Sequence, residues 1–306
     1  MIAIGIDVGG TKIAAGLVDV QRAAVLQRVQ TPTLAKRGGQ AVLNDVMRLA
    51  QSLTSNLQSS IPIGLDVCEL VDAQGNVTSD FTIAWKGVPV REALSAIAPC
   101  VIEADVRAQA LAEAMFGAGK GFDPFVFVNI GTGISSCLVQ GDVPFAGARG
   151  NALVLATGPI SVPGALPFVL EEFASGLAVA TRYAAASAQR VRGSEAEDPL
   201  SANSAKAEEV VALANSGDEI ARQILQSAGH AMGSALGWLA NVLDPAAIVM
   251  GGGLGTADGL YWDALVRSTR EHIWSEDTRT LPIVKAALGA DAGLIGAALT
   301  AANMMR

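Results

Sequence analysis

The stretch GIDVGGTKIAAGLVD, residues 5–19, places two apolar runs on either side of a Gly-Gly-Thr-Lys sequence. Apolar runs of this length, bounded by glycines, predict two neighbouring strands joined by a tight turn. Glycine has no Cβ and can adopt positive φ, so its backbone N–H groups can come close to a phosphate. The stretch therefore predicts a β-hairpin whose tip either binds a phosphate or is a plain turn.

The same pattern returns in PFVFVNIGTGISSCLVQGD, residues 124–142, which again indicates a strand, a glycine turn and a strand. A third glycine cluster, residues 251–253, follows the apolar run AAIVM. Two glycine turns at the starts of two similar halves, with a third cluster after a buried strand, indicate a nucleotide site. The turns do not match Gly-x-x-x-x-Gly-Lys-Ser/Thr, and the third cluster lacks the context of a dinucleotide-binding fingerprint.

Strands and helices alternate along the rest of the chain, which indicates an α/β fold in two similar halves. Apolar residues at helical spacing predict helices, and short apolar runs predict further strands. Asp105 stands where the N-cap of a helix is expected. The helices are expected at about 39–57, from near 89, at 105–117, at about 218–243 and at 289–304, the further strands at 61–67, 99–105 and 246–250, and a surface loop at 192–204.

The composition excludes several classes of protein. Apolar residues make up 51% of the 306 residues and the formal net charge is −8, so neither a disordered chain nor a nucleic-acid-binding protein is expected. Cys68, Cys100 and Cys137 are widely spaced and odd in number, which favours reduced core cysteines in a cytoplasmic protein. The uncharged run at 152–170 contains three prolines that would break a membrane helix, and the first residues lack the features of a signal peptide.

Five further segments follow the first glycine hairpin along the chain: AWKGVPV (84–90), EADVRAQALAEAMFGAGKG (103–121), EEFASG (171–176), LDPAAIVMGGGLG (243–255) and GLIGAAL (293–299). Together with the two glycine hairpins, these segments resemble, in order and spacing, the ROK family of sugar kinases and repressors. The resemblance covers nearly the whole chain and implies a two-lobed actin-like ATPase (ribonuclease H-like) fold, in which each lobe is a mixed sheet flanked by helices. It implies an N-terminal lobe of residues 1–115, a C-terminal lobe of residues 116–289, and a C-terminal helix, about 290–306, that packs back on the first lobe.

The resemblance implies an ATP-dependent kinase that moves the γ-phosphate of ATP to a hydroxyl of a hexose or amino sugar. Asp105 matches the family's catalytic aspartate, which would accept the hydroxyl proton as the sugar oxygen attacks phosphorus. Taken without the family, Asp105 is an ordinary helix cap. Asp7 matches the residue that would hold Mg²⁺ through water. The nucleotide would be held by Gly9, Gly10, Thr11, Lys12, Gly131, Thr132, Gly133, Gly252 and Gly253.

The chain departs from the family where the sugar kinases bind zinc and part of the sugar. Ala104 replaces the Asn before the catalytic Asp, and LVLAT, residues 153–157, replaces a Gly-Glu-x-Gly-His sequence. The cysteine-rich loop that completes the zinc site is replaced by SVPGALPFVL, residues 161–170, which has neither cysteine nor histidine. We therefore expect no structural zinc.

Three positions remain candidates for substrate binding beside Asp105. Glu171 matches the family's second sugar-binding glutamate, with an ordinary helix-start glutamate as the alternative. Glu69 replaces a glycine that approaches the sugar, and Thr82 lies near the family's usual asparagine before Trp85. His230 is expected to be a core residue.

A sugar kinase is the interpretation we favour, because both phosphate turns are intact. A non-catalytic sugar or nucleotide sensor, a pseudokinase, would explain the replaced sugar ligands. A phosphotransferase that acts on a carboxylate or a small polyol would fit the fold equally well. We expect a small-molecule sugar as substrate, a homodimer or homotetramer, and no contact with nucleic acid or membrane.

Overall fold

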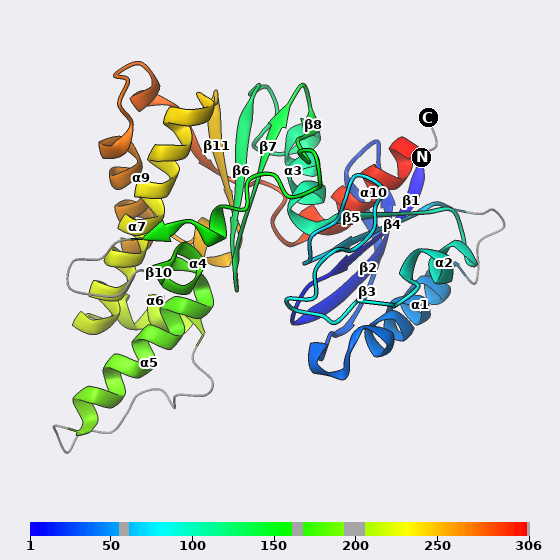
Figure 1. The fold of residues 1–306 in the computed structure, drawn as a ribbon, viewed down its shortest axis with the longest axis horizontal. Helices are drawn as coiled ribbons and strands as arrows, with labels where there is room; N and C mark the ends of the chain where they lie inside the picture. Colours follow the sequence, from blue (N-terminus) through cyan, green and yellow to red (C-terminus); the bar gives the residue numbers. More distant parts are fainter. Residues whose placement is uncertain (55–60, 161–167, 193–205, 305–306) are drawn as a thin grey trace. The chain divides into compact units, whose positions relative to one another are not determined.

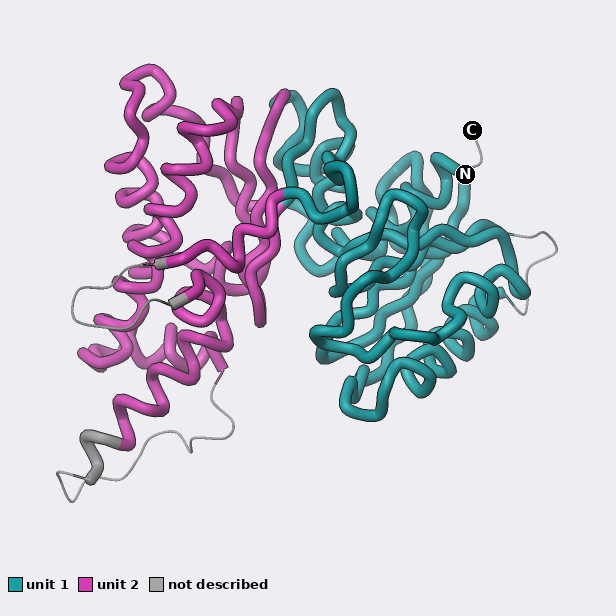
Figure 2. Tube along the Cα trace, in the orientation of Figure 1, with its two compact units in different colours: residues 1–122, 137–152, 287–306 teal, residues 123–136, 153–286 magenta. Residues whose placement is uncertain are grey.

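The computed structural model describes residues 1–54, 61–160, 168–192 and 206–304. The chain forms two compact units (Figure 2). Unit 1 contains Met1–Phe122, Cys137–Ala152 and Ala287–Arg306, and unit 2 contains Asp123–Ser136 and Leu153–Ala286. The surface loop expected at 192–204 lies, apart from its first residue, outside the described residues. The functional lobes expected from the sequence, 1–115 with the C-terminal helix and 116–289, stay a prediction.

Unit 1 contains a five-stranded mixed sheet. Its order is β3 (Ala24–Pro32), β2 (Lys12–Asp19), β1 (Ile2–Val8), β4 (Ile63–Val67) and β5 (Cys100–Ala104). β1 pairs antiparallel with β2 and parallel with β4, so the first predicted hairpin is confirmed. β3 was not predicted from the sequence: none of its side chains is fully buried, so the strand lacks an apolar pattern.

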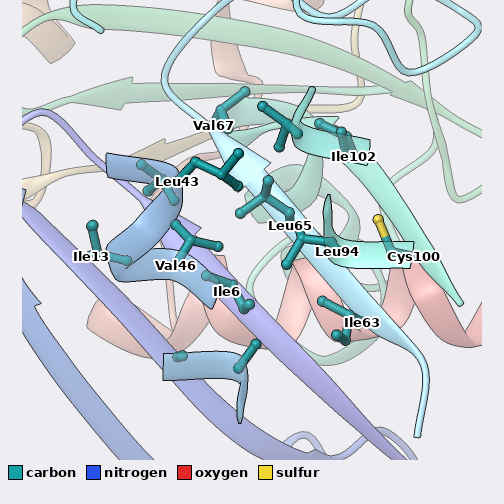
Figure 3. Close-up of a cluster of buried hydrophobic side chains, with 14 of the residues drawn as sticks. Ile6, Ile13, Leu43, Val46, Ile63, Leu65, Val67, Leu94, Cys100 and Ile102 are labelled. Atoms are coloured by element: carbon teal, nitrogen blue, oxygen red, sulfur yellow. The ribbon is translucent and has the colours of Figure 1, made fainter. Parts of the chain in front are cut away.

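Helices cover both faces of this sheet (Figure 1). α1 (Gly39–Thr54) and α2 (Val90–Ser95) pack on one face, where Ile6, Leu43 and Leu94 belong to a continuous apolar core (Figure 3). α3 (Asp105–Phe116) and α10 (Ala292–Met304) pack on the other face, where Leu111 and Leu294 contact small side chains of the strands. Burial of both faces explains why β1 and β4 are almost continuously apolar.

α10 packs on β1 and β4 with almost no space between the backbones. Gly5 and Gly64 are partners in register on these two strands. A Cβ added at Gly5 would lie 2.0 Å from the carbonyl oxygen of Leu294, and one added at Gly64 would lie 1.8 Å from that of Ala297. Only glycine permits this approach, so the two glycines fix the helix on the central strands of the sheet.

A second five-stranded sheet has the order β12 (Ile283–Lys285), β11 (Ala247–Gly251), β6 (Phe125–Ile130), β7 (Ile134–Gln140) and β8 (Val143–Pro144). β11 pairs parallel with both β6 and β12. β6 and β7 are neighbours in the sheet, joined by residues 131–133, which confirms the second predicted hairpin. Every side chain of β11 is buried, as expected for a strand covered on both faces.

The longest helix of unit 2 packs closely on another helix. α7 (Glu219–Leu243), predicted at about 218–243, lies against α9 (Leu260–His272). Gly229, Gly233 and Gly237 recur once per turn of α7, and a Cβ added at each would lie 2.3, 2.3 and 2.8 Å from a carbonyl oxygen of α9. The glycine stripe therefore allows the two helices to pack closely.

No helix in the described ranges could cross a membrane. The remaining elements are α4 (Leu170–Ala174), α5 (Gly176–Arg192), α6 (Ala207–Asn215), α8 (Gly253–Thr256), β9 (Pro159–Ile160), β10 (Phe168–Val169) and the 3₁₀ helices η1 (Ala35–Arg37), η2 (Leu155–Thr157), η3 (Thr278–Thr280) and η4 (Gly289–Asp291).

Candidate active site

The carboxyl ends of the parallel strands of unit 1 bring aspartates together. Asp7 in β1 is the register partner of Asp66 in β4, and Asp105 follows directly after β5. Burial raises the pKa of Asp7, while the contact with Asp66 and the charge of Lys12 lower it. A Cβ added at Gly293 would lie 2.7 Å from Asp7 Oδ2, so the first turn of α10 leaves space for this carboxylate.

Asp105 occupies the first helical position of α3. The N-cap is Ala104, so the prediction that Asp105 is the N-cap was wrong by one residue. The side chain still satisfies the helix start, because the backbone N–H of Val106 donates to Asp105 Oδ1 at 2.6 Å. Burial, followed by the charge of Asp7, raises the pKa of Asp105 from its ordinary value of 3.8 to about 7. A carboxylate with this pKa can accept a proton near neutral pH.

Asp66 is a member of this cluster that the sequence analysis missed. Its side chain is 0% exposed, and none of the residues that the structure describes donates a hydrogen bond to Oδ1 or Oδ2. Burial, then the charges of Asp7 and Asp105, raises its pKa well above the ordinary value. A signal was available in the sequence, because Ile-Gly-Leu-Asp-Val at 63–67 repeats Ile-Gly-Ile-Asp-Val at 4–8.

The tip of the first hairpin is exposed, and hydrogen bonds from Thr33 stabilise its backbone. The Gly9 N–H donates to the Lys12 carbonyl at 3.0 Å, which closes the turn. Thr33 donates from its hydroxyl to the Gly9 carbonyl at 2.6 Å and from its backbone to the Thr11 carbonyl at 3.0 Å. Gly10, Thr11 and Lys12 remain exposed. The hairpin is thus a rigid backbone turn with its tip open to solvent.

Glu69 organises the segment that runs beside this tip. Its carboxylate, 5% exposed, accepts hydrogen bonds from the backbone N–H groups of Phe81, Thr82 and Ile83 at 3.0, 2.6 and 2.9 Å, and from the Ser79 hydroxyl. Four donors use the usual acceptor capacity of a carboxylate. Glu69 therefore has a structural role here, and direct contact with a substrate stays a prediction.

Thr82 is placed beside the first hairpin by that network. A Cβ added at Gly10 would lie 3.0 Å from Thr82 Cγ2, so the methyl group lies against the glycine tip. Trp85, three residues further on, is 3% exposed and belongs to the core of unit 1. The predicted substrate contact of Thr82 remains open.

The second glycine turn, in unit 2, is bound by Glu171 at the start of α4. The Gly131 N–H donates to the Gly133 carbonyl at 3.0 Å, and the Gly176 N–H at the start of α5 donates to the Gly131 carbonyl at 2.9 Å. Glu171 Oε2 accepts from the Ile134 N–H at 2.7 Å, and a Cβ added at Gly133 would lie 2.5 Å from that oxygen. The residue expected to bind sugar therefore lies directly at a turn expected to bind phosphate.

The third glycine cluster lies where β11 meets the end of β6 in unit 2. Gly252 has φ of +80°, and a Cβ there would lie 2.3 Å from the Ile130 carbonyl oxygen. Both features require glycine. Gly253 begins α8, and a Cβ there would lie 3.6 Å from Glu208 Oε1. The backbone is therefore open at Gly253 and tightly packed at Gly252.

Two expectations about metal and histidine have different outcomes. His230 was predicted to be a core residue, which is wrong: it is exposed, because the glycine stripe and not this position forms the buried face of α7. Of the replaced zinc loop at 161–170, residues 161–167 lie outside the described residues. Among the residues that the structure does describe, no three His, Cys, Asp or Glu side chains are grouped to hold a metal ion.

Comparison with known proteins gives a consistent result. The ROK family model matches residues 3–304. The bifunctional enzyme NanE/NanK of Brucella melitensis is 33% identical over 98% of this chain, which spans about half, 54%, of that relative. The glucokinase of Streptomyces coelicolor is 28% identical over 97% of this chain and 96% of its own length.

Solved structures extend the match to the fold. A ROK family glucokinase from Streptomyces griseus, in complex with glucose and AMPPNP, has a TM-score of 0.82 and 26% identity over 99% of this chain and 100% of its own. The ROK hexokinase from Thermus thermophilus has a TM-score of 0.77 and 29% identity, covering 100% of this chain and 99% of its own. The two mixed sheets flanked by helices thus match the actin-like ATPase fold, as the resemblance implied. The chain belongs to the ROK family.

Proposed function

We propose that this chain is an ATP-dependent sugar kinase, which transfers the γ-phosphate of ATP to a hydroxyl of a hexose or amino sugar. Its relatives include proteins named glucokinase and N-acetylmannosamine kinase, and the similar Streptomyces griseus structure holds glucose and an ATP analogue. The observation that carries the proposal is Asp105, whose pKa of about 7 suits a base at neutral pH.

Asp105 would act as the general base. Its Oδ1 accepts the Val106 N–H, so the helix start fixes the orientation of the carboxylate. The attacking sugar hydroxyl would give its proton to this carboxylate as the oxygen bonds to the γ-phosphorus and the bond to the β-phosphate oxygen breaks. Such a base contributes about 10²- to 10⁴-fold to the rate.

The nucleotide would be held by backbone groups of the three glycine segments. In unit 1 the open tip Gly10–Lys12 offers N–H groups and one cationic side chain to the phosphates. In unit 2 the turn at 131–133 offers the same kind of surface, and the backbone at Gly252 and Gly253 would lie along the adenosine. Glu171 would orient the sugar beside the second turn. Thr82 would contact the substrate, and Glu69 would act through the segment it holds.

The residues at the ends of β1 and β4 fit a Mg²⁺ ion. Mg²⁺ prefers oxygen ligands and is usually bound by one or two carboxylates together with phosphates and waters. Asp7 supplies such oxygens, and Asp66 beside it has two buried oxygens to which no residue of the described part of the chain donates. Asp7 would hold the ion through water. When bound, the ion would neutralise charge on the phosphate oxygens. We propose no structural zinc.

A sugar sensor without catalysis is the second candidate. It is favoured by Ala104 and by residues 153–157, which replace family positions that contact sugar and zinc. We also propose that the chain works in the cytoplasm, without nucleic acid, as a homodimer or homotetramer.

The two candidates are separated by calorimetric titration with Mg-ATP and by a coupled ADP-release assay over a panel of hexoses and N-acetylhexosamines. A kinase shows ADP release that depends on one or a few sugars. Binding of ATP with no turnover on any sugar would refute the kinase and favour the sensor. Turnover confined to acids or polyols would instead revive a different phosphotransferase.

A further inference from the structure

Asp66 is the buried acid that the proposed reaction leaves without a role. It is 0% exposed, and within the described ranges neither carboxyl oxygen accepts a hydrogen bond. Asp45, another buried acid of unit 1 at 5% exposure, forms ion pairs with Arg37 and Arg48. A buried carboxyl group needs such a partner, because its desolvation is otherwise uncompensated.

The charged groups that act most strongly on Asp66 are themselves acids: Asp7, Asp105 and Glu103. Glu103 is its register partner on β5, but Glu103 already binds the Arg107 guanidinium and the Ala104 N–H. Of the other two acids, Asp105 follows β5, and Asp7 is the register partner of Asp66 on β1. The two carboxyl oxygens of Asp66 therefore lie beside the Asp7 carboxylate, which is expected to hold a cation.

We propose that Asp66 is a second protein carboxylate for the divalent cation held by Asp7. The proposal rests on the proposed function only for the identity of that cation as Mg²⁺. Two carboxylates are a usual number for Mg²⁺, since waters and phosphate oxygens complete its shell. The ion would supply the opposite charge that Asp66 lacks among the acids around it.

The competing description is that Asp66 carries a proton and donates it to Asp7. Asp66→Asn separates the two, because an amide can also donate to Asp7 but is a much weaker ligand for a hard cation. Under the competing description the Asn variant binds a cation as well as the wild type does. Under our proposal it does not.

The experiment is a titration of the full-length chain with Mn²⁺ alone, followed by calorimetry and by the EPR signal of free Mn²⁺, with no nucleotide or sugar. We expect the wild type to bind Mn²⁺ and Asp66→Asn to lose at least about tenfold in affinity. Asp45→Asn, which removes a buried carboxylate elsewhere in unit 1, should bind like the wild type. Unchanged affinity of Asp66→Asn, or no Mn²⁺ binding by the wild type, would overturn the proposal.

Folding of each variant is checked by circular dichroism. Should Asp66→Asn fail to fold, Asp66→Ser removes the carboxylate with a smaller side chain and is judged by the same outcomes. The readout is independent of turnover. A chain that binds Mn²⁺ through Asp66 but transfers no phosphate would refute only the kinase, whereas turnover with unchanged Mn²⁺ affinity in Asp66→Asn would refute only the role of Asp66.

Discussion

Replacing Asp105 by Asn is expected to make the protein more stable above neutral pH. The pKa of Asp105 is raised to about 7, chiefly by burial and then by the charge of Asp7, so the folded state disfavours its ionised form. Asn keeps the carbonyl oxygen that accepts the Val106 N–H and removes the ionisable group. The Asp105 carboxylate therefore lowers the free energy of unfolding of the protein.

The magnitude follows from the linkage between pKa and folding. A rise of the pKa from 3.8 to about 7 corresponds to about 4 kcal/mol, at about 1.4 kcal/mol for each pH unit. Because Asp105 is only half-buried, we expect about 2–4 kcal/mol. Below pH 3.8 Asp105 is protonated in both the folded and the unfolded state, so it does not lower the free energy of unfolding. The wild type then loses stability relative to the variant as pH rises from about 4 to 7, and the full difference is present above pH 7.

Urea unfolding of the wild type and Asp105→Asn, followed by circular dichroism at pH 5 and pH 8, measures this difference. The variant should gain more at pH 8 than at pH 5. Asp45→Asn is the matched control. It should be less stable than the wild type at both pH values, because it removes the ion pairs with Arg37 and Arg48. The reasoning is refuted if Asp105→Asn is no more stable than the wild type at pH 8.

Two further substitutions test the packing of unit 1. Gly64→Ala should destabilise the protein by at least about 1–3 kcal/mol in urea unfolding, because its Cβ would lie 1.8 Å from the Ala297 carbonyl oxygen; unchanged stability would mean that α10 does not lie against β4. Glu113→Ala should cost about 3 kcal/mol or more, because the buried carboxylate accepts from the backbone N–H groups of Ala118, Ala287 and Leu288, and Glu113→Gln should cost less. Equal unfolding midpoints for Glu113→Ala and the wild type would contradict this network.

The parts of the fold that the sequence predicted are those with strong local patterns. Both glycine hairpins and the long helix α7 carry an apolar pattern or a glycine turn that is visible within about ten residues. β3 was missed because an exposed edge strand has no such pattern. The one-residue error in the N-cap concerns the start of α3, where the cap is Ala104 and Asp105 is the first helical residue. Helix ends are commonly uncertain by one or two residues.

The sequence predicted single residues of the candidate site, but not the contacts between them. The resemblance pointed to Asp7 and Asp105, yet nothing local to Glu69 shows that its carboxylate holds residues 79–83. The repeat of residues 4–8 at 63–67 marks Asp66 in the sequence, but only the register of β1 and β4 places it beside Asp7. Contacts between residues distant in the sequence decide such roles, and only the folded chain supplies them.

The account's central claim is that Asp105 takes the proton from the acceptor hydroxyl. The most direct measurement is the rate of phosphate transfer from Mg-ATP, at pH 8 and saturating substrate, by the wild type and Asp105→Asn with a sugar that the wild type phosphorylates. We predict a rate lower by about 10²- to 10⁴-fold in the variant, with the affinity for Mg-ATP retained. Normal turnover by Asp105→Asn would contradict the claim.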